Sequence, residues 1–196
     1  MNLPNRLTIL RIVLAFVFMF LLFSPGLVGK ILALVAFTIA CVTDFYDGYV
    51  ARKYNLITDL GKLLDPIADK VLVLAAFLSF VQMRLIPAWM VVVIILRELI
   101  VTGIRIIGLK KGRVLAASMA GKHKTVSQMV SIFFILGVII INESSSAGFS
   151  SWSSDHKIFL QNSVYISMII TIALTLISGM SYFIKNLDIF GALKDD

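Results

Sequence analysis

The sequence is poor in the residues that give soluble proteins a water-facing surface. Only 15% of its 196 residues are charged, whereas 59% are hydrophobic. Soluble domains have about 25% charged and about 45–50% apolar residues, so this chain lacks the polar side chains to cover a soluble globule. At roughly 20 residues per spanning helix, its length allows about six spans and no separate soluble domain. We therefore expect an all-α membrane protein with six transmembrane helices, folded as a single integral-membrane domain over residues 1–196.

Cysteine and histidine are also scarce. The chain has one cysteine, Cys41, and two histidines. A single cysteine excludes an internal disulfide and any zinc site built from several cysteines. The apolar neighbours of Cys41 indicate a packing role for it.

Long apolar runs are plentiful, and polar breaks divide them into six predicted helices. The breaks are Ser24-Pro25-Gly26, Pro87 at the start of the fourth helix, and a polar stretch at 142–157 that predicts the one long loop. The predicted helices cover residues 5–23, 28–52, 61–81, 86–109, 121–141 and 158–185.

The basic residues are distributed unevenly between the two ends of these helices. If the amino terminus, the 52–62 and 109–122 turns and the carboxy terminus lie on one side, that side holds all but three of the 18 Lys and Arg residues. The positive-inside rule makes this side cytoplasmic, which predicts a multi-pass protein of the cytoplasmic membrane in which any site at these helix ends faces the cytoplasm. The net charge of +7 favours membrane lipids or phosphorylated substrates as partners. It does not favour nucleic acid, because the chain has no soluble basic domain.

Four aspartates interrupt the second and third apolar runs. Asp44 and Asp47 are three residues apart and Asp65 and Asp69 are four apart, so each pair shares one helix face. An ionised Asp at membrane depth costs on the order of 2.5–3.5 kcal/mol, and four neighbouring carboxylates repel one another, so a cation is required. Oxygen ligands without nearby Cys or His indicate Mg²⁺ or Mn²⁺, and four carboxylates suit two divalent ions that bridge a phosphate.

The residues around the aspartates fit such a site. Gly48, Ala51 and Gly61 lack bulky side chains, so a ligand or a neighbouring backbone can approach the carboxylates. Arg52, at the predicted helix end, can bind a phosphate oxygen bidentately. We interpret Asp59 as a solvated loop residue. A purely structural seam of interhelical ion pairs is the alternative, and the excess of acids over local bases opposes it.

The two acidic segments together form a family motif. The chain reads D-x-x-D-G-x-x-A-R over 44–52 and, after eight residues, G-x-x-x-D-x-x-x-D over 61–69. This spacing resembles the signature of the CDP-alcohol phosphotransferase family. The six predicted helices extend the resemblance over nearly the whole chain. All eight fixed positions are present, as Asp44, Asp47, Gly48, Ala51, Arg52, Gly61, Asp65 and Asp69.

The resemblance implies the membrane fold of that family and a two-metal transfer of a phosphatidyl or similar group from a CDP-linked donor to an alcohol, with release of CMP. It implies that Asp44, Asp47 and Asp65 hold the metal ions and that Asp69 both touches metal and serves as the general base. It also implies room for the cytidine at the two glycines, and a homodimer. The residues assigned to the CDP-linked donor are Asn5, Thr8, Gly48, Ala51, Arg52 and Gly61.

A second polar region lies on the fourth and fifth predicted helices. Glu98, Thr102 and Arg105 recur at spacings of four and three, which gives a polar stripe on an apolar helix. Polar residues within a membrane helix face the bundle interior by default, and basic groups near a metal-bound pyrophosphate suit a phosphorylated acceptor. The residues predicted to bind the acceptor phosphate are Arg105, Lys122, Lys124, Thr125 and Gln128.

Secondary motifs narrow the acceptor. The opening at 2–11, the Arg97-Glu98 pair and the stretch at 121–128 resemble family members that use CDP-diacylglycerol as donor and sn-glycerol 3-phosphate as acceptor. Phosphatidylglycerol, as in cardiolipin synthesis, and inositol phosphate are alternative acceptors. Two local alternatives are that Asn5 caps the first helix and that Arg97 with Glu98 is only a buried ion pair that holds two helices together.

A divalent-cation transporter is the alternative from another functional class, because intramembrane acids also mark ion pathways. The acids here cluster at one cytoplasmic depth, and the outer halves of the helices are almost free of charge. Transport requires polar groups on both sides, so the sequence favours an enzyme.

Overall fold

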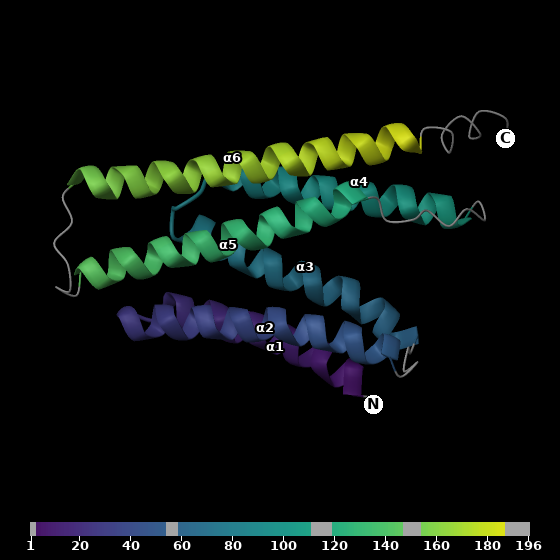
Figure 1. Ribbon diagram of the computed structural model, residues 1–196, viewed down its shortest axis with the longest axis horizontal. Coiled ribbons are helices and arrows are strands. Elements are labelled where there is room, and N and C mark those ends of the chain that lie inside the picture. Colours follow the sequence, from purple (N-terminus) through teal and green to yellow (C-terminus); the bar gives the residue numbers. More distant parts are fainter. Residues whose placement is uncertain (1–2, 54–58, 111–118, 147–153, 187–196) are drawn as a thin grey trace. The chain divides into compact units, whose positions relative to one another are not determined.

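The computed structural model describes residues 3–53, 59–110, 119–146 and 154–186, and throughout these ranges the only regular structure is helical. This confirms the prediction of an all-α protein with six helices. The six helices are α1 (Leu3–Phe23), α2 (Leu27–Lys53), α3 (Asp59–Gln82), α4 (Ala88–Lys110), α5 (Met119–Ser146) and α6 (Ser154–Lys185) (Figure 1).

The predicted long loop at 142–157 is wrong in its extent. Helix α5 continues through Ser146 and α6 begins at Ser154, so both helices extend into the polar stretch. A helix that is already formed gains one backbone hydrogen bond for each residue it adds. The polar residues at 142–146 therefore continue α5 instead of ending it.

Two expectations about helix ends are also wrong. Asp59 was expected in a turn, but it is the first residue of α3, and acidic residue types are favoured at helix amino termini. Asn5 was considered as the cap of the first helix. Because α1 begins at Leu3, Asn5 lies inside the first turn and does not precede the helix.

Length and composition identify membrane-spanning segments in three of the helices. These are Leu27–Asp44 in α2, Lys124–Ser145 in α5 and His156–Lys185 in α6, with a shorter apolar stretch at Leu7–Phe23 in α1. In α3 and α4 the charged residues of the polar segments interrupt the apolar runs. The membrane character is thus confirmed, and the count of six spans stays a prediction.

The chain divides into two compact units. The first contains Met1–Leu85 and Ile132–Gln161, and the second contains Ile86–Ser131 and Asn162–Asp196. We call them unit 1 and unit 2 and describe each by itself.

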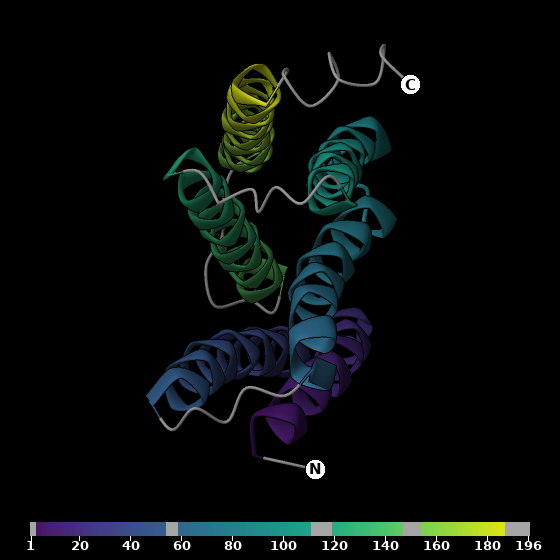
Figure 2. The same ribbon diagram turned by 90° about the vertical axis from the view of Figure 1, so that its right-hand side faces the viewer.

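In unit 1, α1 packs along α2 and crosses α3 (Figure 1 and Figure 2). The rings of Phe18 and Phe37 lie 5.4 Å apart, and those of Phe37 and Phe133 lie 5.3 Å apart. Ala15 and Ala33 are fully buried, and such small residues let helices approach closely without competing polar groups. This packing fixes which faces of α2 and α3 meet α1.

The turn between α1 and α2 is held by a buried lysine. Lys30 Nζ donates hydrogen bonds to the carbonyl oxygens of Leu22, at 2.6 Å, and Ser24, at 2.8 Å. The last carbonyls of a helix have no partner within the helix, so this side chain satisfies the end of α1. Gly26 adopts a φ of 84°, a left-handed conformation that glycine takes without strain.

Unit 2 contains an apolar cluster of Val101, Ile104 and Tyr182, and polar contacts join its helices. The hydroxyl oxygens of Ser131 on α5 and Thr171 on α6 lie 2.5 Å apart. Both side chains are buried. Such hydrogen bonds align helices where apolar packing alone gives little orientation.

Candidate active site

Three side chains of unit 1 meet at one point. Arg11 Nη1 lies 2.5 Å from Asp44 Oδ1 and 2.6 Å from Asp69 Oδ1, which joins α1 to both α2 and α3. We call this group the Arg11–Asp44–Asp69 cluster. It shows that carboxylates from two different helices converge on a single position, as the sequence predicted for the aspartates.

The members of the cluster differ in exposure. The Arg11 side chain is fully buried, whereas the side chains of Asp44 and Asp69 are 44% and 55% exposed. A buried guanidinium needs charged acceptors, because an uncompensated charge in the protein interior is strongly destabilising. The two charge-assisted hydrogen bonds supply them. The cation therefore lies beneath two carboxylates that remain accessible from outside the unit.

The other two aspartates belong to the same helices. Asp47 lies one turn beyond Asp44 on α2, and Asp65 lies one turn before Asp69 on α3, so the backbone register places each pair on one face. Their side chains lie outside the described residues. The same holds for the side chains of other donor-site candidates, namely Asn5, Gly48, Ala51, Arg52 and Gly61.

Thr8 is the one donor-site candidate whose side chain is described. It is fully buried on α1 and lies three residues before Arg11, so the two residues share a helix face. This position puts Thr8 one helical turn from Arg11, the residue that contacts Asp44 and Asp69.

The chemistry of the cluster fits a hard divalent cation. Its acceptors are carboxylate oxygens, the ligands that Mg²⁺ and Mn²⁺ prefer, and they converge where a positive group already lies. Within the described part of the chain, no group of three or more His, Cys, Asp or Glu side chains gathers as a metal site. A full set of four carboxylates would need Asp47 and Asp65.

The role of Arg11 was missed from the sequence, which identified this residue only as part of the basic side and of the opening motif. A signal was present, because an arginine within an apolar helix is expensive unless it faces the interior and meets an anion. The two partners lie 33 and 58 residues away, so only the packing of α1 against α2 and α3 identifies them.

A second charged group lies in unit 2. Glu98 on α4 forms an ion pair with Lys124 on α5 and accepts a bond from Arg97 Nη1 at 3.3 Å. Arg97 Nη2 donates to Ser178 Oγ on α6 at 2.8 Å. We call Arg97, Glu98 and Lys124 the Arg97–Glu98–Lys124 network. Since Arg97 and Glu98 are adjacent on one helix, the alternative that their pair holds two helices is wrong; Lys124 and Ser178 make the links between helices.

The packing around Arg97 depends on a glycine. A Cβ atom at Gly179 would lie 3.0 Å from Arg97 Cγ and 3.3 Å from Arg97 Nε, tighter than most real contacts. Glycine at this place lets the Arg97 side chain, only 9% exposed, lie against α6.

The acceptor-phosphate candidates occupy different environments. Lys124 and Gln128 are buried on α5, one turn apart, and Gln128 Nε2 has no hydrogen-bond partner among the described residues. Arg105 and Thr125 are exposed, and the side chain of Lys122 is outside the described residues. The structure thus brings Lys124 and Gln128 to the buried face of α5 and leaves Arg105 and Thr125 on the outside.

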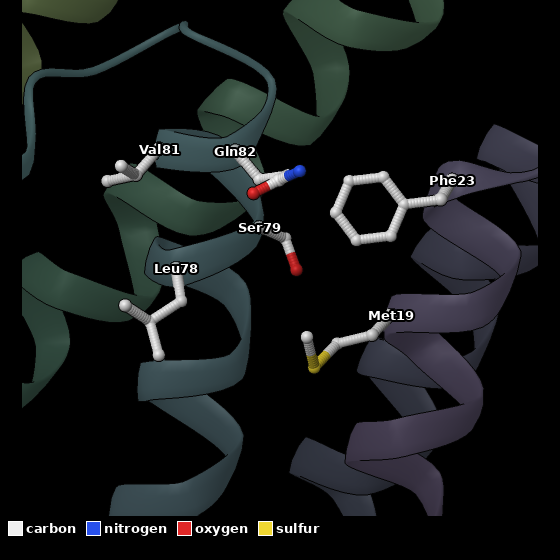
Figure 3. Close-up of a pocket in the computed structure, with 6 residues that line it drawn as sticks. All are labelled: Met19, Phe23, Leu78, Ser79, Val81 and Gln82. Atoms are coloured by element: carbon white, nitrogen blue, oxygen red, sulfur yellow. The ribbon is translucent and has the colours of Figure 1, made fainter.

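A cavity of about 410 Å³ lies in unit 1 between the later parts of α1 and α3 (Figure 3). Its lining is mainly apolar, and the Ser79 hydroxyl is already bonded to the carbonyl oxygen of Ala75 at 2.7 Å. The lining residues identified in the described chain carry no titratable group, so we assign this cavity no chemistry. They are Met19, Phe23, Leu78, Ser79, Val81 and Gln82.

Comparison with known proteins adds independent information. A family model described as CDP-alcohol phosphatidyltransferase matches residues 1–183. A Bacillus subtilis protein named CDP-diacylglycerol–glycerol-3-phosphate 3-phosphatidyltransferase is 39% identical over 94% of this chain and 95% of its own length. A Rickettsia bellii protein of the same name is 36% identical over 93% of each chain. A Mycobacterium tuberculosis protein named probable phosphatidylglycerophosphate synthase is 34% identical over 98% of this chain and 85% of its own.

Proposed function

Because the chain belongs to the CDP-alcohol phosphatidyltransferase family, we propose that it transfers the phosphatidyl group from CDP-diacylglycerol to sn-glycerol 3-phosphate. The products are phosphatidylglycerophosphate and CMP, and the reaction is a step of phospholipid biosynthesis. The names and near full-length coverage of the relatives support these substrates. The observation that carries the site is the convergence of Asp44 and Asp69 on one cation position.

Asp44, Asp47, Asp65 and Asp69 hold two divalent ions, Mg²⁺ or Mn²⁺. When bound, these ions neutralise the pyrophosphate of the donor and stabilise charge on the CMP leaving group. The side chains of Asp44 and Asp69, about half exposed, leave an open side from which such ions can enter. The convergence of these two carboxylates, which come from different helices, supports a shared cation site.

Asp69 acts as the general base. It accepts the proton of the glycerol 3-phosphate 1-hydroxyl as that oxygen bonds to the β-phosphorus of CDP-diacylglycerol and the bond from this phosphorus to CMP breaks. The carboxylate is 55% exposed, so a substrate hydroxyl can reach it. Orientation of both reactants by fixed residues supplies much of the rate, because in-line attack requires close alignment.

The CDP part of the donor lies against the start of α1 and the small residues of both halves of the motif. Arg52 binds a phosphate oxygen, and residues without bulky side chains leave space for the cytidine. Thr8 supports this placement because it shares a face of α1 with Arg11. The donor site comprises Asn5, Thr8, Gly48, Ala51, Arg52 and Gly61.

The acceptor phosphate is held by basic and polar residues of α4 and α5. The Arg97–Glu98–Lys124 network contains two cations and one carboxylate, so its net charge is positive and suits an anion. We assign the phosphate to Arg105, Lys122, Lys124, Thr125 and Gln128.

The chain is a single integral-membrane catalytic domain over residues 1–196. The family model supports this proposal because it extends through both units. The protein is a homodimer in the cytoplasmic membrane, and its active site faces the cytoplasm, as the placement of the basic residues favours.

The test is an acceptor panel. Purified protein receives CDP-diacylglycerol, Mg²⁺ and one alcohol at a time, and CMP release is measured. We expect fast release with glycerol 3-phosphate and little with glycerol, phosphatidylglycerol or inositol phosphate. If CMP release is faster with one of these three alcohols than with glycerol 3-phosphate, that alcohol is the acceptor. The assignment as a transferase would still stand. Transport of Mn²⁺ into proteoliposomes without CMP release would contradict the enzyme assignment.

A further inference from the structure

Arg11 places a fixed positive charge where the proposed metal ions need negative ligands. Its Nη1 atom lies 2.5 Å from an oxygen of Asp44 and 2.6 Å from an oxygen of Asp69. A guanidinium group stays charged under all physiological conditions, and at these distances it occupies lone pairs that a metal ion would use. The guanidinium and a divalent ion therefore compete for the same two carboxylates.

We propose that Arg11 is a positioning residue that acts as an internal counter-ion. It holds Asp44 and Asp69 together before metal binds, and it weakens the affinity of these carboxylates for the metal. This inference rests on the proposed function, since it takes Asp44 and Asp69 as metal ligands. Without a counter-ion, two ionised carboxylates on neighbouring membrane helices would repel each other and destabilise the metal-free protein.

The sign of the effect follows from charge and from access. A unit positive charge a few ångströms from a dication is unfavourable at any effective dielectric found in proteins. Arg11 is buried beneath the carboxylates, whose open sides are about half exposed, so it does not form the entry path of the ion. Removal of the guanidinium should therefore tighten metal binding while it destabilises the metal-free protein. A residue that only shaped the site would give weaker binding when removed.

The test measures metal binding directly. Full-length protein stripped of metal is titrated with Mn²⁺, and the free ion is followed by its electron paramagnetic resonance signal. Arg11→Met should lower the Kd for Mn²⁺ by about tenfold, because the repelling charge is gone. Arg11→Lys keeps the charge, so its Kd should stay within about threefold of the wild type. Metal-free Arg11→Met should melt below the wild type, and saturating Mn²⁺ should raise its Tm by more than it raises that of the wild type.

Two controls separate this effect from a general loss of buried charge. Lys30→Met removes another buried cation of unit 1, whose hydrogen bonds go to backbone carbonyls, and it should leave the Kd for Mn²⁺ unchanged. Asp44→Asn should abolish tight binding in both the wild-type and the Arg11→Met backgrounds, which locates the ion at the cluster.

The possible outcomes distinguish failure of the Arg11 inference from failure of the metal assignment. An unchanged or higher Kd in Arg11→Met overturns the inference, and so does an Arg11→Met protein that fails to fold even when Mn²⁺ is present throughout purification. If wild-type protein binds Mn²⁺ through Asp44 but the Kd does not change when Arg11 is replaced, the inference fails and the metal assignment stands. If neither protein binds Mn²⁺, the metal assignment itself is wrong and the inference falls with it.

Discussion

Two charged groups in the described part of the chain have opposite compositions. The Arg11–Asp44–Asp69 cluster of unit 1 has one cation and two carboxylates, whereas the Arg97–Glu98–Lys124 network of unit 2 has two cations and one carboxylate. The carboxylates of the first are about half exposed, and the cations of the second are buried. An accessible excess of negative charge suits a metal ion, and a buried excess of positive charge suits a phosphate. Under the proposed function, the metal ions belong to the first group and the acceptor phosphate to the second.

Metal removal should have the largest effect on the rate, because it leaves the whole proposed acidic site without an ion. Excess EDTA should abolish CMP release completely, and either Mg²⁺ or Mn²⁺ in excess should restore it. The measurement is CMP release in detergent micelles before and after the metal is returned. Full turnover in EDTA would show that the aspartates do not work through a metal ion.

Neutralising one proposed metal-binding carboxylate should have the next largest effect on the rate. Asp44→Asn, and likewise Asp47→Asn and Asp65→Asn, should lower kcat by roughly a thousandfold through lost metal binding. Glu143→Gln is the matched control, since Glu143 is a carboxylate of unit 1 on α5 outside the cluster. Its rate should stay within about twofold of the wild type. Equal losses in Asp44→Asn and Glu143→Gln would remove the distinction between the cluster and other acids.

Asp69→Asn should affect turnover at least as much as it affects metal binding, because Asp69 is also assigned proton transfer. At saturating Mg²⁺ its kcat should remain lower by about a hundredfold or more. Single-turnover CMP release over a range of Mg²⁺ concentrations checks this. Near-normal kcat at high Mg²⁺ would leave Asp69 as a metal ligand and reject it as the base.

Changes in the Arg97–Glu98–Lys124 network should alter the KM for the acceptor alone. Lys124→Met should raise the KM for glycerol 3-phosphate by about tenfold and leave the KM for CDP-diacylglycerol unchanged. The double variant Lys124→Met/Glu98→Gln also removes the carboxylate that loses its Lys124 partner, and it should show the same KM change, which separates binding from folding. Lys157→Met, an exposed lysine of α6, serves as the control for a lost positive charge. An unchanged acceptor KM in both Lys124 variants would move the phosphate site elsewhere.

The smallest expected effect is structural. Ser178→Ala removes the hydroxyl that accepts a hydrogen bond from Arg97 Nη2, so the free energy of unfolding should fall by about 1 kcal/mol. A thermal melt compared with wild type measures this loss. Both KM values should be unaffected, and a raised acceptor KM would instead place Ser178 in the binding site.

The sequence was informative where the signal was local. Apolar runs predicted six helices, and the spacing of Asp44 with Asp47 and of Asp65 with Asp69 predicted two acidic faces before any contact was known. The convergence of Asp44 and Asp69 agrees with that prediction.

Local sequence patterns did not predict contacts between residues that are far apart in the sequence. The bonds of Arg11 to the aspartates depend on the rotation of α1 against α2 and α3, which no local pattern specifies. The capping of α1 by Lys30 was likewise invisible, because a lysine beside a turn has many alternative partners. The end of α5 was misjudged because polarity alone does not stop a helix that lacks glycine or proline at its end.

The most direct test of the account follows the labelled acceptor into the product. Vesicles containing CDP-diacylglycerol and Mg²⁺ receive wild-type or Asp44→Asn protein with isotope-labelled glycerol 3-phosphate, and lipid products and CMP are quantified together. The account predicts labelled phosphatidylglycerophosphate and CMP in equal amounts from the wild type, and roughly a thousandfold slower formation of both by Asp44→Asn. Wild-type CMP release without labelled lipid, or labelled lipid from Asp44→Asn at the wild-type rate, would contradict it.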